Sequence, residues 1–219
     1  MGEYWRCTAI EPETRLRVGR GIGQTETQAA TELWTQVKKR TAHRDSPPPI
    51  LSDGWGGHRE ALVQVYGQVP PYKGRGRRPT RKQPGDDWHY TQMVKQRDAK
   101  GNLIGVEVRV IYGDDTTLAR TGERTTCVER TNLTSRHMNG RLVRKTLGYS
   151  KRLEMLRAAS AWEDMVYNFA RPVKTLRQEI DTSGKRWRQQ SPAMAAGLMH
   201  HIWSLRDLLM CVPVPIHSI

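Results

Sequence analysis

The sequence predicts an α/β fold, and three observations support this prediction. Residues 4–23 have the pattern of two short strands around a turn, and an amphipathic helix follows them. A short apolar strand at 50–51 precedes Asp53, and residues 89–112 have the pattern of a longer hairpin. From about residue 126 the pattern is helical almost to the end. Strands that alternate with helices indicate a layered α/β or α+β domain. We expect a core domain over 1–150 and a helical C-terminal part over 151–219 that packs on it.

The first elements have clear turn and capping signals. Pro12 stands second in the four-residue turn 11–14, where its fixed φ favours a turn. Thr25 is a suitable N-cap for the first helix, and Gln28 follows at the capping-box position. Apolar residues then recur at helical spacing and predict the buried stripe of this helix: Ala29, Ala30, Leu33, Trp34 and Val37.

The later elements are expected in a fixed order. The hairpin 89–112 has its turn at 98–102, where the sequence reads DAKGN. Helices are expected at 126–146, 149–170, 174–180 and 201–210, with a loop over 181–191. Two apolar groups are interpreted as packing residues: Trp162, Tyr167 and Phe169 as core, and Trp203, Leu205, Leu208 and Leu209 as a closing helix.

Positive charge is concentrated in two blocks. The chain has 219 residues, 36 Lys and Arg against 22 Asp and Glu, and a formal net charge of +14. The blocks contain no acid and comprise Lys73, Arg75, Arg77, Arg78, Arg81 and Lys82, then Arg130, Arg136, Arg141, Arg144, Lys145, Lys151 and Arg152. Concentrated cations favour nucleic-acid phosphate as a partner. The alternative is a solvated helix face or a disordered loop.

Other classes of protein are disfavoured by composition. No apolar run approaches the roughly 18 residues of a membrane helix. The first residues, MGEYWRCTAI, do not have the pattern of a secretion signal. Three widely spaced cysteines predict neither a disulfide framework nor a zinc knuckle. We therefore expect a reduced, cytoplasmic protein.

Two carboxylates have the right setting for chemistry. Asp53 follows a short strand and precedes Gly54 and Gly57. Glu129 lies near the start of a long basic helix, where Asn132 and Arg136 share its face by their spacing. Carboxylate oxygens are the ligands that Mg²⁺ and Mn²⁺ prefer, and two such ions can support phosphodiester chemistry. The alternative is that Asp53 is a turn residue and Glu129 a surface residue that makes salt bridges.

Several ordered blocks of sequence resemble one known family. They are WRCTAIEPETRLRVGRGIG at 5–23, SDGWGGH at 52–58, CVERTNLTSRHMNGRLVRKTLGYSK at 127–151, YNFARPVKTLR at 167–177 and SPAMAAGLMHHIWSLRDLL at 191–209. Together they resemble the catalytic domain of insertion-sequence transposases, of the insertion-sequence-one type. The resemblance covers most of the chain.

The resemblance implies a ribonuclease H-like mixed sheet flanked by helices, with an Asp-Asp-Glu triad that binds two Mg²⁺ or Mn²⁺ ions. Such enzymes cleave DNA at transposon ends and join it to target DNA, as homo-oligomers that pair two ends. By resemblance, Asp53 matches the second acid and Glu129 the third. A prokaryotic, nucleoid-associated location follows. The expected DNA-binding positions are Lys73, Arg75, Arg77, Arg78, Arg81, Lys82, Arg130, Asn132, Arg136, Arg141, Arg144 and Lys145, with a structural role for Asn132 as an equal alternative.

The sequence departs from the family at its start. The first Asp and its central strand are expected before the hairpin, and no residue of this chain matches them. The family's amino-terminal DNA-binding module has no counterpart either. We expect another segment to fill the gap, or the isolated chain to be marginally stable. A frameshift product and a decayed gene copy would both explain the missing strand. The alternative function is therefore a non-catalytic DNA-binding remnant or an inhibitor of transposition. A basic RNA-binding protein is a third.

Overall fold

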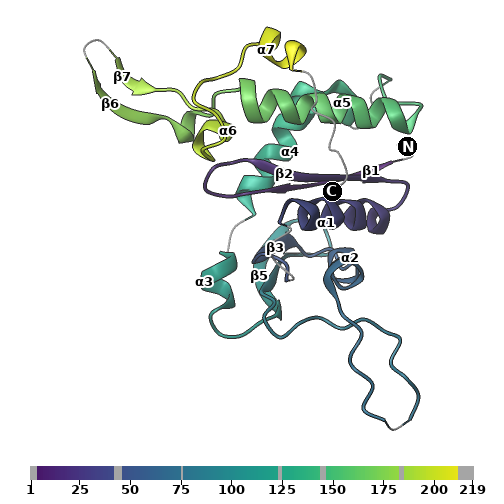
Figure 1. Cartoon of the computed structure of the whole chain (residues 1–219). Helices are drawn as coiled ribbons and strands as arrows, with labels where there is room; N and C mark the ends of the chain where they lie inside the picture. The colour runs from purple at the N-terminus through teal and green to yellow at the C-terminus, as the bar shows by residue number, and fades with distance from the viewer. Residues whose placement is uncertain are drawn as a thin grey trace. The chain divides into compact units, whose positions relative to one another are not determined.

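The computed structural model describes residues 4–41, 46–74, 76–122, 125–143, 147–182 and 185–211. The chain divides into two compact units (Figure 1). Unit 1 comprises Met1–Ala9 and Val18–Thr131, and unit 2 comprises Ile10–Arg17 and Asn132–Ile219. The candidate carboxylates Asp53 and Glu129 both belong to unit 1.

The chain begins with the expected hairpin and helix, and the turn of the hairpin (10–17) belongs to unit 2. Strands β1 (Trp5–Ile10) and β2 (Arg17–Gly23) form a two-stranded sheet, and α1 (Glu26–Arg40) follows. The hydroxyl of Thr25 accepts a hydrogen bond from the Gln28 backbone N–H at 3.2 Å, as the N-cap prediction requires. The Gln28 side chain returns to the N–H of Gln24 instead of Thr25, so the capping box is shifted by one residue.

Helix α1 buries the stripe that its sequence predicts. Its buried residues are Ala29, Ala30, Leu33, Trp34 and Val37. Strand β2 lies so close to this helix that a Cβ on Gly21 would stand 1.8 Å from the Ala29 carbonyl oxygen. Glycine at this position is therefore required by the close approach of two backbones.

A three-stranded mixed sheet forms the rest of the unit 1 framework. Its strands are β3 (Ile50–Asp53), β4 (Tyr90–Arg97) and β5 (Leu103–Tyr112), in the order β3-β4-β5. Strands β3 and β4 are parallel and are joined through α2 (Gly57–Tyr66), whereas β4 and β5 form the expected antiparallel hairpin. The turn 98–102 closes on the Asp98 carboxylate, which accepts hydrogen bonds from the N–H groups of Lys100 and Asn102.

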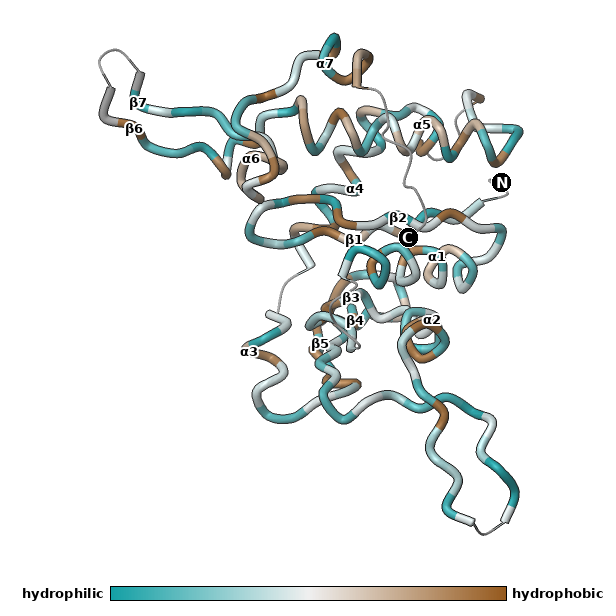
Figure 2. The backbone as a smooth tube through the Cα atoms, in the orientation of Figure 1, coloured by the Kyte–Doolittle hydropathy of each residue, from teal (hydrophilic) through white to brown (hydrophobic). Residues whose placement is uncertain are grey.

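The two faces of this sheet have different neighbours. Ile50 and Tyr90 belong to an apolar core that also contains Leu33 of α1, Leu62 of α2 and Trp88, which precedes β4. In Figure 2 brown, apolar segments occur along α1 and α2. The opposite face carries Asp53, Met93 and Lys95, because residues alternate sides along a strand and paired residues share a side. We call this second face the α4 face.

Helices α3 (Thr117–Thr121) and α4 (Thr126–Met138) contact the α4 face. Thr91 donates a hydrogen bond to the Thr121 hydroxyl at 2.9 Å. The Thr125 hydroxyl, one residue before α4, lies 3.3 Å from the Met93 sulfur. Helix α4 thus starts over β4 and then continues from unit 1 into unit 2.

Unit 2 differs from its sequence prediction in several places. Helix α4 ends at Met138, and a 3-10 turn, η1 (Gly140–Leu142), follows. Helix α5 (Leu153–Met165) passes into a π-helical segment, η2 (Val166–Ala170). Two short helices close the described chain: α6 (Pro192–Ala195) and α7 (Leu205–Met210).

The helix expected at 174–180 is wrong. A single 3-10 turn, η3 (Lys174–Leu176), leads into a hairpin of β6 (Gln178–Thr182) and β7 (Lys185–Arg188). The physical reason is local, because Ile180, Thr182 and Trp187 favour strands and flank a Ser-Gly turn dipeptide. The loop expected over 181–191 therefore contains half of this hairpin.

The packing residues expected in unit 2 are confirmed only in part. Tyr167 is buried and Phe169 packs on Trp203, with ring centroids 5.1 Å apart. Trp162, by contrast, is 40% exposed, so its interpretation as core was wrong. In the closing helix Leu208 is buried, but Leu205 and Leu209 are exposed.

The fold is mixed α/β with small sheets, one of them mixed. In the described part of the chain the hairpin β1–β2 and the sheet β3-β4-β5 are separate sheets, and no strand joins them. No described segment therefore fills the gap left by the missing central strand, which was one of the two outcomes expected from the sequence. None of the described helices combines the length and apolarity that crossing a lipid bilayer requires.

Candidate functional site

Asp53 is the last residue of β3, and its side chain is exposed. The end of β3 is held by Ser52 on the opposite face, whose hydroxyl lies 2.9 Å from the buried Tyr90 hydroxyl. Gln92 donates hydrogen bonds to the Tyr90 hydroxyl at 2.7 Å and to the Trp55 carbonyl at 3.0 Å. This network holds the end of β3 and the turn after it, so it positions the Asp53 carboxylate at the rim of the sheet.

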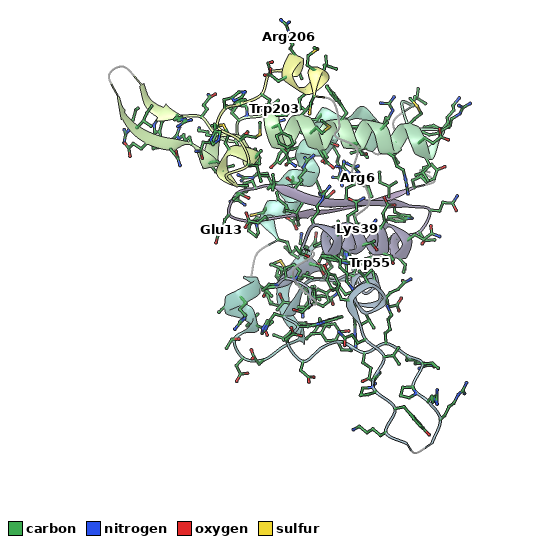
Figure 3. The ribbon with its side chains drawn as sticks, in the orientation of Figure 1. Arg6, Glu13, Lys39, Trp55, Trp203 and Arg206 are labelled. Carbon is green, nitrogen blue, oxygen red and sulfur yellow. The ribbon has the colours of Figure 1, made fainter. Side chains whose placement is uncertain are left out.

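The turn after Asp53 is shaped by Trp55. A Cβ on Gly57 would stand 2.0 Å from the Trp55 indole, so only glycine leaves room for the ring. The indole meets His58 edge-on, with ring centroids 5.1 Å apart, and Trp34 meets the same imidazole from α1. Burial lowers the pKa of His58, an effect that the charge of Asp53 partly opposes. Figure 3 labels Trp55 at this position. His58 is thus a packing residue.

Glu129 lies in the first turn of α4 and is exposed. Its Oε1 atom accepts a hydrogen bond from Lys95 Nζ at 2.5 Å, and the Thr125 hydroxyl lies 3.3 Å from the same oxygen. The hydrogen bond from Lys95 lowers the pKa of Glu129, and the charge of Lys95 and the Thr125 hydroxyl add to this effect. The carboxylate is therefore ionised at neutral pH, the form that binds a cation.

The structure brings both predicted carboxylates to the α4 face. Asp53 pairs with Met93 on β4, and Lys95 is two residues further along β4 on the same side. Glu129 reaches this side through its ion pair with Lys95. Sequence reasoning did not find Lys95, because only the structure shows that it lies on the same side of the sheet as Asp53 and pairs with Glu129.

Cys7 on β1 adds information about the chemistry of this region. Burial raises the pKa of its thiol to about 12, and the negative charges of Asp53 and Glu26 contribute. The thiol is therefore protonated at neutral pH. Asp53 and Glu129 present oxygen donors, which fit Mg²⁺ or Mn²⁺ by ligand type.

Both carboxylates also make the contacts that the structural alternative predicts. Asp53 Oδ1 lies 3.4 Å from the Trp55 backbone N, a long turn contact, and Glu129 makes a salt bridge. Within the described ranges no three His, Cys, Asp or Glu side chains gather in a group that could hold a metal ion. The residues present thus fit a metal ion by ligand type but do not form a complete shell among themselves.

The first basic block forms a long excursion between α2 and β4, which we call the basic arm (residues 67–85; Figure 1). It has six cations, four prolines and no acid. The described cations are all exposed: Lys73, Arg77, Arg78, Arg81 and Lys82. Arg75 is outside the described residues.

The root of the arm is fixed on the core. Gln68 and Gln83 exchange backbone hydrogen bonds of 3.1 and 2.9 Å, and Lys82 Nζ donates to the Gln64 carbonyl at 2.6 Å. The preceding and following rings, Tyr66 and Trp88, are buried and pack edge-on at 6.4 Å. The two ends of the arm are therefore held in place on unit 1, and the exposed cations lie on the chain between them.

The arm has a single aromatic side chain, Tyr72, which is exposed. The Arg78 guanidinium lies 5.4 Å from the centroid of the Tyr72 ring, and the Tyr72 hydroxyl donates to the Gly76 carbonyl. Single-strand binding relies on aromatic faces on which bases stack. The arm is thus better suited to phosphate contact than to base stacking.

The remaining predicted DNA-binding residues are distributed over both units. Arg130 is exposed in unit 1. Asn132, Arg136 and Arg141 are exposed in unit 2. The two other predicted positions, Arg144 and Lys145, lie outside the described residues. The buried side of α4 consists of Thr131 and Ser135, continued by Asn139.

Comparison with known proteins adds no assignment. No protein-family model, curated protein or solved structure matches this chain.

Proposed function

We propose that this chain is the catalytic part of a DNA transposase, which cleaves phosphodiester bonds at transposon ends and joins them to target DNA. The observation that carries the proposal is the position of Asp53 and Glu129 on the α4 face of one sheet. The ordered sequence blocks that resemble insertion-sequence transposases support it, and the basic arm supplies a surface for the polyanionic substrate.

In this proposal Asp53 and Glu129 hold Mg²⁺ or Mn²⁺. When bound, the metal activates a water or a DNA 3′-hydroxyl and stabilises the leaving oxygen. Lys95 keeps Glu129 ionised and turned toward β4. The Ser52–Tyr90–Gln92 network keeps Asp53 at the strand end. Each residue therefore either provides an oxygen ligand or positions one.

The alternative is a DNA-binding protein without catalytic activity, such as an inhibitor that occupies transposon ends. It is favoured by the contacts that Asp53 and Glu129 make as ordinary turn and salt-bridge residues. Under this alternative the arm carries the function and the carboxylates only stabilise unit 1.

Plasmid nicking distinguishes the two functions. Supercoiled DNA with matching transposon ends is incubated with Mn²⁺ and the wild type, Asp53→Asn or Glu129→Gln. We expect both substitutions to reduce nicking by at least about 100-fold, because each removes a metal ligand, while DNA binding is retained. Asp115→Asn, an exposed acid of the same unit, is the matched control and should nick normally. Nicking that survives Asp53→Asn would show that the metal site is wrong. Tight binding without nicking supports the alternative.

The contribution of the basic arm is measured separately by the salt dependence of DNA binding. Replacing Lys73, Arg77 and Arg81 with Gln should reduce the slope of log affinity against log salt by up to about 3, since each lost phosphate contact removes about 0.9. Arg78 and Lys82 are left in place because they contact Tyr72 and Gln64.

The matched control removes three exposed cations elsewhere in unit 1 and gives the same change in net charge. Its substitutions are Lys39→Gln, Lys100→Gln and Arg120→Gln; Lys39 is labelled on α1 in Figure 3. Equal slopes for the two triple variants would show that net charge, and not the arm, determines binding.

A further inference from the structure

Strand β5 is an edge strand with unusual exposure. The sheet order β3-β4-β5 leaves one side of β5 without a partner strand in the described part of the chain. The strand is ten residues long and contains neither Pro nor Lys, the residues with which proteins commonly protect an edge. Val106 is 50% exposed and Val110 44% exposed. A long edge strand with exposed valines is a template for pairing with another strand.

The side chains of β5 are sorted onto two faces. Between the irregularities at its ends, Gly105–Val110 keeps an unbroken register with β4. Val106, Val108 and Val110 pair with Lys95, Met93 and Thr91, so these valines lie on the α4 face. Glu107 and Arg109 lie on the opposite face and form a two-bond ion pair of 2.7 and 2.8 Å.

This pattern is self-complementary. When two copies of β5 pair antiparallel about a two-fold axis at Val108, Glu107 of one copy faces Arg109 of the other, twice. Val106 of one copy then faces Val110 of the other, and the valines of both copies form one apolar row on the α4 faces. Moving the axis to Glu107 or to Arg109 places like charges opposite each other, which destabilises a strand pair. An axis placed between two residues would pair a residue of one face with a residue of the other face. Such a register is excluded, because paired residues lie on the same side of a sheet.

We propose that β5 pairs with β5 of a second copy of this chain, in the register centred on Val108, to form a continuous six-stranded sheet. Such an interface is isologous, so the same patch serves both copies. The axis is perpendicular to the sheet, and the two α4 faces therefore lie on the same side. The proposal depends on the edge and its charges and is independent of any catalytic role of Asp53 or Glu129.

Charge reversal tests the register. The mass of the purified full-length chain is measured in solution over a range of concentrations, by sedimentation or light scattering. Reducing agent is present because Cys7, Cys127 and Cys211 have free thiols. We expect a dimer for the wild type and for Asp53→Asn. Glu107→Arg and Arg109→Glu should each weaken the dimer by at least about tenfold, since each turns two attractive contacts into repulsive ones.

Two rescues make the test specific. An equimolar mixture of the Glu107→Arg and Arg109→Glu chains should form a heterodimer, because the register again places opposite charges face to face. The double variant with both substitutions should dimerise alone for the same reason. Lys100→Glu, a charge reversal in the adjoining turn, should have no effect. A monomeric wild type overturns the proposal. It is also overturned if both single variants dimerise as strongly as the wild type, or if their equimolar mixture stays monomeric.

Discussion

The two units of this protein are stabilised in different ways. Unit 1 has a continuous apolar core in which ten buried side chains from helices, strands and loops form one cluster. Unit 2 has few buried apolar side chains among its described residues, and its buried positions include Arg17, Glu163 and Asn168. The comparison shows that one chain can combine a core held by apolar contacts with a unit built around buried charge.

The charged centre of unit 2 is compact. Arg17 Nη1 forms ion pairs with Glu163 and, at 2.9 Å, with Asp164. The Asn168 side chain accepts from the Arg17 backbone N–H at 3.0 Å and donates to its carbonyl at 3.1 Å. The guanidinium also lies 3.9 Å from the centroid of the Tyr167 ring. Within unit 2, a single arginine thus ties the segment 10–17 to α5 and the π-helical segment.

The largest effect is expected for Arg17→Met. It removes the cation that two carboxylates contact, and breaking a buried pair in this way costs about 3–5 kcal/mol. Hydrogen exchange under native conditions measures the result, with α5 losing protection while α1 keeps it. Lys174→Met removes an exposed cation of the same unit and should change neither region. Equal loss of protection in α1 and α5 would contradict a separate charged centre in unit 2.

The smallest effect is expected for the exposed ion pair of unit 1. A double-mutant cycle with Lys95→Met and Glu129→Gln should give a coupling energy below about 1 kcal/mol at pH 7, because solvent screens the pair. The cycle is measured by denaturant unfolding. A coupling of several kcal/mol would show that the pair is held as firmly as the buried one.

The pH dependence of this coupling has a definite sign. Lys95 lowers the pKa of Glu129 in the folded protein. The contribution is therefore fully present above the unfolded value near 4.5 and is lost as the pH falls through the folded pKa. Repeating the cycle in acid should give a coupling close to zero. A coupling energy that increases in acid would contradict the lowered pKa of Glu129.

Sequence reasoning succeeded where apolar periodicity determines structure. The helix with Leu33 and Trp34, the strand before Asp53 and the hairpin 89–112 are all confirmed, and all belong to unit 1. Each element has an apolar side that packs into one core, so its pattern is visible in the sequence.

The same reasoning failed in unit 2 because polar contacts determine its structure. Trp162 has helical spacing but is exposed, whereas Glu163, its charged neighbour, is buried against Arg17. The two partners are 146 residues apart, and no local pattern indicates such a pair. The hairpin β6–β7 was missed for a different, local reason: the residues of η3 just before it suit a helix, although Ile180, Thr182 and Trp187 favour strands.

The candidate site was predictable only by residue type. Asp53 and Glu129 were selected by their setting and by the family resemblance, and the structure places both on the α4 face. That Lys95 lies on the same face as Asp53 follows from strand register, which a single sequence does not determine. Whether the two acids bind a metal ion remains a prediction.

The root of the basic arm has a consequence for how this protein can evolve. Because Gln68 and Gln83 are hydrogen-bonded neighbours, the chain between them begins and ends at the same place on unit 1. Lengthening a loop with fixed ends costs only about 0.6 kcal/mol for each doubling of its length. Insertions and deletions in this segment are therefore nearly neutral for folding. A lineage can change the number of exposed cations by altering the arm alone, without disturbing the carboxylates.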